Sequence, residues 1–316
     1  MVMSSVESDM AQLTAAHVLA SLQAGESLSQ AELSHLDLSQ KRLDGGDFSG
    51  AYLRRANLQG ACCQAANFSQ ATLVLADLSD STLTSAQLSE AVLTQAKLQR
   101  GRLEGAIARS AEMFGADLEQ VNARRACFDK ANLRNVTAAQ SRFDGASLVA
   151  ANLNEANFSQ SSLAAAHLSN STWRQATLVG VSFAGAELTQ AQLPGALLMG
   201  ANFSEADLLS CELPEADLTG AVLQAAQMDW ADLWHAVLVG ADLRQASLYG
   251  ATLAYANLSR VNFAGADLRQ ANLEKAQLNE ARFDQAMVRG ALFTDSSGLT
   301  DAQKQWLRFH GALNVA

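Results

Sequence analysis

Apolar residues recur every five positions along most of this chain of 316 residues. From position 31 the sequence reads in fives as AELSH, LDLSQ, KRLDG, GDFSG, AYLRR and ANLQG, and the frame continues without insertion or deletion to ALFTD at 291–295. We call the third residue of each quintet its centre. The centre is Leu in 35 of the 53 quintets and Phe in another 10, and the residue two places before it is Ala in 40 of them. The repeat therefore supplies one large and one small apolar position at a constant spacing.

Neither of the two common regular structures can bury such a pattern. In an α-helix a step of five residues turns roughly 500°, so successive centres would differ by about 140° and spread around the axis. In an extended strand successive side chains point to opposite faces, so an odd period would alternate between them. A chain that turns a corner after every quintet keeps each centre inside, and four quintets close a square coil. Backbone groups of stacked coils can then pair as in a parallel sheet.

Several quintets fit the consensus A(D/N)LXX, among them ANLQG at 56–60, ADLTG at 216–220, ADLRQ at 241–245 and ANLEK at 271–275. With these motifs the chain resembles the pentapeptide-repeat family, whose members form a right-handed quadrilateral β-helix. The resemblance implies an all-β solenoid over residues 31–295. It would have about 13 coils, and at ~4.8 Å per layer it would be on the order of 60 Å long. Both ends would be open backbone edges, so residues 1–30 and 296–316 are expected to cap them with short α-helices.

The N-terminal segment carries the spacing of such a helix. Met10, Leu13, His17 and Leu22 recur at helical intervals and predict an apolar face over about 8–24. Gly25 follows at the position where a glycine commonly ends a helix.

The C-terminal segment carries a second helix signal. Thr300 followed by Gln303 predicts a capping box that opens a helix at about 301–309. Its apolar residues, Trp306, Leu307 and Phe309, are expected either to cover the last coil or to form a homodimer through this end of the rod. The family resemblance implies the second role, because some members dimerise through a C-terminal helix.

The core pattern is least regular in the middle of the chain. The centres Ala108, Ala123 and Ala138 replace Leu there, and loss of large core side chains removes packing. We therefore expect the rod to be thinner or bent at these coils. Phe114 follows the inward Met113 and is expected to lie outside.

Charge is unevenly distributed along the repeat. The formal net charge is −10, which disfavours direct binding to nucleic acid phosphates. Residues 97–142 hold nine Lys and Arg but only five Asp and Glu, whereas residues 175–243 hold nine acids and no Lys or Arg. Such an asymmetric field can orient a charged partner.

The acidic segment ends in a group of outward aromatic residues, which continues just beyond it. Outward positions 20 residues apart should stack, so five aromatic side chains are expected to gather near one edge of the rod. Grouped exposed Trp and Tyr are typical of protein contacts. We therefore predict a protein-binding patch made of Trp230, Trp234, His235, Tyr249 and Tyr255, together with the acids Glu187, Asp207, Glu212, Glu215, Asp229 and Asp232.

Nothing in the sequence indicates catalysis. The repeat has no inserted loop and no dinucleotide, phosphate-loop or zinc-protease motif, so we expect no catalytic residue, no cofactor and no metal site. Of the cysteines, Cys62 is expected outside and Cys63 inside, which prevents joint chelation. His167 should stack beside Glu187 as an ordinary surface pair.

Two function classes remain open. A stiff rod with a polarised surface favours a non-catalytic scaffold or adaptor that binds a protein of unknown identity. The segment GESLSQAELSHLDLSQ at 25–40 resembles the start of pentapeptide proteins associated with bacterial secretion clusters, which implies an adaptor role in secretion. The alternative, also implied by the family, is a DNA-mimicking modulator of DNA gyrase that protects against quinolones.

Location is an expectation from absent signals. The sequence lacks a membrane-spanning apolar run, and MVMSSVESDM lacks the regions of a signal peptide. We therefore expect a cytoplasmic protein with no membrane partner, bacterial as the family implies, or one exported by a route that uses no signal peptide.

Overall fold

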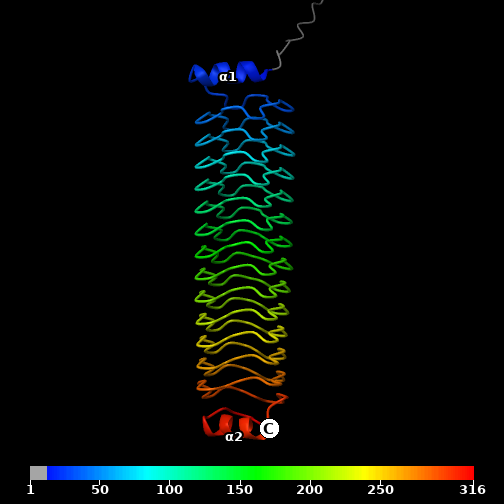
Figure 1. Ribbon diagram of the computed structural model, residues 1–316, viewed down its shortest axis with the longest axis vertical. Coiled ribbons are helices and arrows are strands. Elements are labelled where there is room, and N and C mark those ends of the chain that lie inside the picture. Colours follow the sequence, from blue (N-terminus) through cyan, green and yellow to red (C-terminus); the bar gives the residue numbers. More distant parts are fainter. Residues whose placement is uncertain (1–12) are drawn as a thin grey trace, which may run out of the picture.

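The computed structural model describes residues 13–316 as a straight rod with a short helix across each end (Figure 1). Helix α1 spans Ala15–Gln23 and helix α2 spans Asp301–Phe309. Between them the chain winds in stacked coils that follow the colour gradient from one end to the other (Figure 1). Neither helix has the length and apolar character needed to cross a bilayer.

Stacked coils are joined by parallel bridges between residues 20 apart, from Glu32 with Tyr52 to Gln277 with Ser297. The bridging residue is the one before each centre. Within residues 13–316 these are isolated bridges, with no longer strand, because the chain turns again after each centre. The 20-residue offset is the one that a square coil of four quintets predicts.

We name the four sides of the rod by their columns of bridging residues. Face A runs from Glu32 in steps of 20, face B from Asp37, face C from Arg42 and face D from Asp47. The last two residues of each quintet form the corner to the next face. Any outward residue can therefore be assigned to a face or a corner.

Each corner is a β-turn with a residue of positive φ in its second central position. After the centre Phe48, for example, Gly50 has φ 65° and Ala51 N donates to Phe48 O at 3.0 Å. This combination defines a type II turn. Non-glycine residues also occupy the position, including Trp230 at φ 61°. Bonds to the next coil hold it there, and Trp230 N donates to Tyr249 O at 2.9 Å.

The core consists of the centres, which are buried along the whole rod, and of the small residues two places before them, which are buried from Gly46 onward. In the first three quintets that second position is only partly buried at Ala31 and Leu36 and is exposed at Lys41. Ala108, Ala123 and Ala138 are fully buried, yet Figure 1 shows no bend at their coils. Phenylalanine occupies the corresponding centre one coil later in all three cases, so large side chains lie beside the small ones. These aromatic residues contact one another in a continuous series formed by Phe128, Phe143, Phe158 and Trp173.

Helix α1 covers the first coil, and two of the residues predicted for its apolar face, Leu13 and Leu22, pack against the core. Thr14 caps the helix and exchanges hydrogen bonds with His17, which is exposed. Val18 is the fully buried residue, so the assignment of His17 to the apolar face is wrong. The capping box explains this, because it holds the imidazole at the helix start. Gly25 follows the helix with φ 72°, as expected, and Met10 lies outside the described residues.

The quintet before residue 31 already has the repeat conformation. Leu28 is 5% exposed, and Leu28 N donates to Asp47 O at 2.8 Å. Gln30 has φ 58° in the corner position. The coils of the structure therefore begin five residues earlier than the expected boundary.

Helix α2 and the tail close the other end. Thr300 and Gln303 form the predicted capping box. Leu307 is fully buried and Trp306 is partly buried, whereas Phe309 is 87% exposed and does not cover the last coil. After the helix the chain returns to the rod, where Leu313 pairs with the last member of face A.

Candidate protein-binding surface

The five predicted aromatic residues form two clusters on opposite edges of face A. Trp230 and Tyr249 occupy the corner before this face, and Trp234, His235 and Tyr255 occupy the corner after it. The expectation of one gathered edge is therefore wrong. The reason is the frame itself, because Trp230 closes one quintet while Trp234 belongs to the next corner, and a face lies between them.

In the first cluster the two aromatic rings meet edge to face. The ring centroids of Trp230 and Tyr249 are 5.4 Å apart at 82°. A Cβ built on Gly250 would lie 2.5 Å from Trp230 Cε3 and Cζ3, so the indole rests on the backbone there. Trp230 is 59% exposed, which leaves its other surface open to solvent. Arg269 covers Tyr249, with Cζ 5.8 Å from the ring centroid.

The second cluster is a stack that runs along the corner. His235 lies parallel to Tyr255, with ring centroids 4.9 Å apart, and Trp234 meets His235 at 73° with centroids 4.0 Å apart. Lys275 ends the stack, with Nζ 5.0 Å from the Tyr255 centroid. Lys275 Nζ also donates to the Tyr255 hydroxyl at 3.0 Å, and this bond raises the pKa of the ammonium.

Acidic side chains lie on face A between the two clusters. Glu212 and Asp232 are bridge partners in the face A column. Asp232 Oδ1 accepts a hydrogen bond from the backbone N of Trp234 at 3.0 Å, which holds the carboxylate against the backbone of the second corner. Glu215 is exposed at the corner position of His235, one coil earlier. Three of the six predicted acids therefore lie on face A or at the corner after it.

The other three predicted acids lie on face D or at the corner between face D and face A. Glu187 and Asp207 are bridge partners on face D, and Glu187 contacts His167 Nδ1 at 2.7 Å, as the 20-residue stacking predicts. Asp229 lies at the corner beside Trp230, where it accepts bonds from the Ser247 hydroxyl and, at 3.1 Å, from Tyr249 N. Asp229 therefore orders the first cluster, whereas the face D pair lies around the corner from it.

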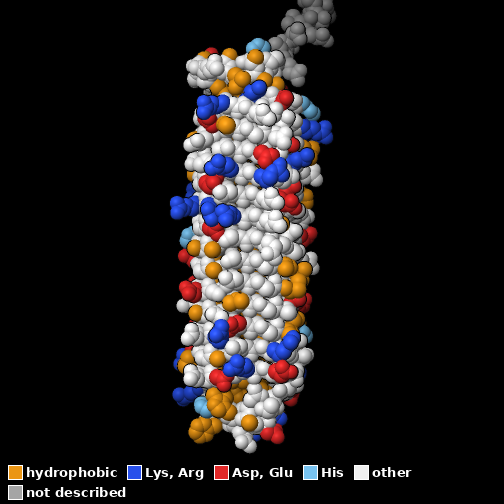
Figure 2. All heavy atoms as spheres, in the orientation of Figure 1, with side chains coloured by type: hydrophobic (Ala, Val, Ile, Leu, Met, Phe, Trp, Pro, Cys, Tyr) orange, Lys and Arg blue, Asp and Glu red, His pale blue; other side chains and the backbone are white. Residues whose placement is uncertain are grey.

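The charges of this part of the rod are largely uncompensated. Between 97 and 142, five of the nine basic side chains form ion pairs with acids: Lys97, Arg100, Arg102, Arg109 and Arg124. Between 175 and 243, Glu187 and Asp242 have ion-pair partners within the described residues, and the other seven acids have none there. On the face shown in Figure 2, blue side chains gather toward α1 and return near α2, with orange, red and white between them.

Three exposed apolar residues near this surface were not predicted. Leu209 is 40% exposed at the corner one coil before Asp229, and Leu197 and Met199 are 42% and 37% exposed on and beside face B. The frame could have found them, because each is a large apolar residue at an outward position. Leu209 shares the corner of Trp230, whereas Leu197 and Met199 lie on and beyond the neighbouring face.

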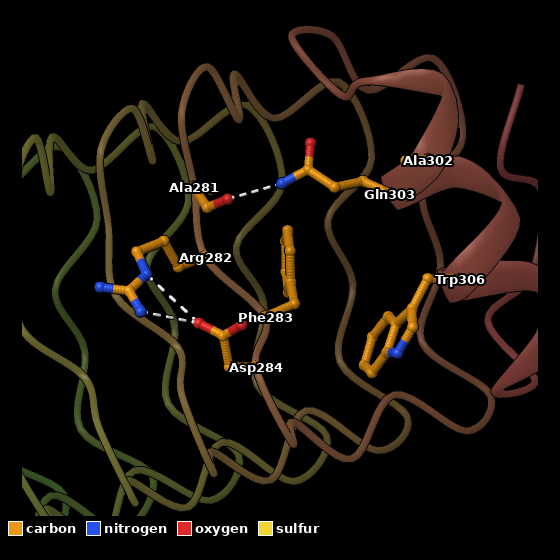
Figure 3. A pocket seen from close by; sticks show the side chains of 7 residues that line it. All are labelled: Ala281, Arg282, Phe283, Asp284, Ala302, Gln303 and Trp306. Carbon is orange, nitrogen blue, oxygen red and sulfur yellow. Dashed lines mark hydrogen bonds and ion pairs between the residues drawn. The ribbon is translucent and has the colours of Figure 1, made fainter.

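A pocket lies under α2 (Figure 3). It has a volume of about 350 Å³ and lies between the side chains of Phe283 and Trp306. Gln303 Nε2 donates to Ala281 O at 2.7 Å across its rim, and Arg282 pairs with Asp284 at 2.9 Å. Because its polar groups bind one another, we interpret the pocket as a packing gap where α2 meets the last coils. Within residues 13–316 no group of three or more His, Cys, Asp or Glu is arranged to hold a metal.

A family model described as pentapeptide repeats matches the chain in eight overlapping copies that together run from residue 27 to residue 295. The chain belongs to the pentapeptide-repeat family. The resemblance inferred from the motifs is thereby confirmed. No curated protein sequence matches this pentapeptide-repeat chain.

Solved structures of other pentapeptide-repeat proteins are similar to it. A trypsin-treated form of QnrB1, a plasmid-mediated fluoroquinolone resistance protein, is 19% identical, with a TM-score of 0.41 over 59% of this chain and 95% of its own. HetL, involved in heterocyst differentiation regulation in the cyanobacterium Nostoc sp. strain PCC 7120, is 28% identical. Its TM-score is 0.22 over 91% of this chain and 100% of its own.

Proposed function

We propose that this pentapeptide-repeat rod is a non-catalytic interaction module that binds a protein partner through face A and its two corners at residues 209–255. The observation that carries the proposal is the pair of exposed indoles, Trp230 at 59% and Trp234 at 41%, on either side of acidic side chains. Large aromatic residues dominate the binding energy of protein interfaces when a partner covers them. The rest of the outer surface is mainly small and polar.

The rod form supports a scaffold or adaptor role. A solenoid whose coils contact only their neighbours presents a long, stiff surface, and its inside is filled by side chains. Binding therefore takes place on the outer surface. An adaptor role in a bacterial secretion or effector cluster is a narrower form of this proposal.

Site-specific photo-crosslinking tests the proposal. A photoreactive amino acid at Thr252, on face A between the clusters, should form adducts with a protein of the native cell. The same group at Thr72, on face A near the other end, is the control. Adducts should disappear in a Trp230→Gln, Trp234→Gln background, because Gln occurs at both corner positions elsewhere in the repeat and preserves the turn. Equal adducts from both positions, or adducts that persist without the indoles, would contradict the proposal.

A second candidate is modulation of a type II topoisomerase by mimicry of duplex DNA, and the acids without ion-pair partners favour it. The arrangement of the acids on the faces opposes it, because no column of the acidic segment holds more than two acids in succession. These are Glu187 and Asp207 on face D, and Glu212 and Asp232 on face A. A gyrase supercoiling assay decides between the two. Inhibition or rescue from a quinolone that depends on these acids would support mimicry.

Association through the rod end is a separate part of the proposal. Phe309 is 87% exposed on α2, and Leu313 beside the last coil is 49% exposed. A second copy of the chain would cover such apolar side chains. Sedimentation of the Phe309→Ser variant should show monomers where the unmodified protein forms dimers.

A further inference from the structure

The two tyrosines and the two tryptophans at the corners beside face A differ in what covers their rings. Tyr249 carries Arg269 on its ring, and Tyr255 carries Lys275. Both cations come from the next coil along the rod. Trp230 and Trp234 lie one coil earlier, in a segment that holds no Lys or Arg from 175 to 243. Among the described residues, no cation lies over either indole.

Both indoles are held in place as platforms. Trp230 rests on Gly250, and the absence of a side chain at that position lets the ring lie against the backbone. Ala254, the residue one coil beyond Trp234, is only 5% exposed although it occupies an outward corner position. Trp234 is ordered by its ring contacts with His235 and Tyr255, and both indoles stay exposed. A platform that is already ordered loses little entropy on binding.

The carboxylates between the platforms determine which partner fits. Glu212 and Asp232 lie on face A between the two corners, and Glu215 lies beside the second one. An apolar partner would remove water from these charges without replacing its hydrogen bonds, which is unfavourable. A nucleic acid or acidic partner would be repelled. A cationic side chain instead gains both the carboxylate and the electron-rich face of the indole.

We propose that the partner presents a basic segment whose Arg or Lys side chains lie on Trp230 and Trp234 and pair with Asp232, Glu212 and Glu215. This inference rests on the proposed function and names the chemistry of its partner. Arg is the favoured residue, because its planar guanidinium stacks on an aromatic face while it donates to a carboxylate. The two cation–tyrosine contacts of the next coil are the same interaction within one chain.

Binding of defined peptides to the full chain tests the inference. The probes are three labelled peptides of equal length that alternate Gly with Arg, with Lys or with Asp, and fluorescence anisotropy is measured at low and at physiological salt. We expect the Arg peptide to bind more tightly than the Lys peptide, and the Asp peptide not to bind. The Trp230→Gln, Trp234→Gln variant should bind the Arg peptide about tenfold more weakly, since each lost cation–π contact contributes roughly 0.5–1 kcal/mol.

Matched variants separate the surface from general charge attraction. Asp232→Asn with Glu212→Gln should weaken Arg-peptide binding and reduce its salt dependence. Asp217→Asn, on face B in the same coil as Glu212, and Tyr52→Ala, an exposed aromatic on face A near the other end, should change little.

The outcomes distinguish this inference from the proposed function. Arg-peptide affinity that is unchanged by loss of both indoles, or reduced equally by the Asp217→Asn control, would overturn the inference. The same holds if the Arg peptide does not bind at all. If specific adducts still form at Thr252 in either case, the surface binds a protein of different chemistry and only the inference fails.

Discussion

Trp230 and Gly250 occupy the same corner of the rod on successive coils, and the indole of one rests on the backbone of the other. A Cβ on Gly250 would approach the ring to 2.5 Å, so this glycine is required for the indole to lie flat. Its φ of 67° is also the value that the turn needs, but other residues tolerate that conformation elsewhere in the chain. The close approach of the ring, and not the turn, makes the glycine specific here.

Gly250→Gln should therefore lift the indole of Trp230 away from the rod. Gly240→Gln is the matched control, because Gly240 has φ 69° and nothing lies within 4 Å of its Cβ position. Both variants should lose about 1 kcal/mol of stability from the strained turn. Only Gly250→Gln should increase acrylamide quenching of tryptophan fluorescence. Equal quenching in the two variants would show that the indole does not rest on residue 250.

The four cysteines provide a test of the coil that needs no partner. Cys63 and Cys211 are fully buried, and burial raises the pKa of both thiols, whereas Cys62 is exposed and Cys127 partly exposed. A maleimide should label Cys62 and Cys127 in the native protein and all four in denaturant, because the thiolate is the reactive form. Mass spectrometry of the peptides identifies each site. Native labelling of Cys63 would contradict the inward direction of the centres.

The buried alanines in the middle of the rod predict an unusual response to a larger side chain. Ala123→Leu restores the commonest residue at a centre, yet Phe143 lies one coil later and fills the neighbouring core. We expect a loss of about 1–3 kcal/mol by overpacking. Leu243→Ala, at an ordinary centre, should lose about 2–5 kcal/mol. A neutral or stabilising Ala123→Leu in denaturant unfolding would mean that the core is loosely packed there.

Acid should destabilise the rod through its hydrogen-bonded carboxylates. The Ser27 and Ser49 hydroxyls, with Asn67, hold the pKa of Asp47 below its ordinary value, and Arg244 does the same for Asp242. A carboxyl with a lowered native pKa adds stability that is present above its unfolded pKa and is lost as the pH falls through the native one. We therefore expect a steady Tm near neutral pH that falls below about pH 4. Asp47→Asn should weaken this fall, and an unchanged profile would show that the bond network contributes little.

The period of five was enough to predict the coil, its 20-residue stacking and the inward residues. It succeeded because each quintet repeats the same turn, so one local rule applied many times determines the rod. Phe114 is exposed as predicted, and the capping box of Thr300 and Gln303 forms as its spacing indicates.

The remaining differences depend on side chains, which the period does not determine. His17 binds back to Thr14, so a residue at apolar spacing lies outside. Phe309 lies in the same helix as the buried Leu307 but faces solvent, because this helix packs only one side against the rod. The aromatic residues near 230 divide between two corners, since position within the quintet decides the corner. Their contacts with Gly250, Arg269 and Lys275 depend on side-chain conformations, which the sequence pattern does not determine.

The unbroken frame also sets rules for how this molecule can change in length. Deleting 20 residues would shorten the rod by one layer, and every downstream side chain would stay on the same face. Deleting five would instead swing the tryptophans a quarter of the way around relative to α1. The length of the rod and the direction in which the tryptophans point can therefore be altered independently. A series of such deletions would reveal whether one partner contacts both halves of the rod at once.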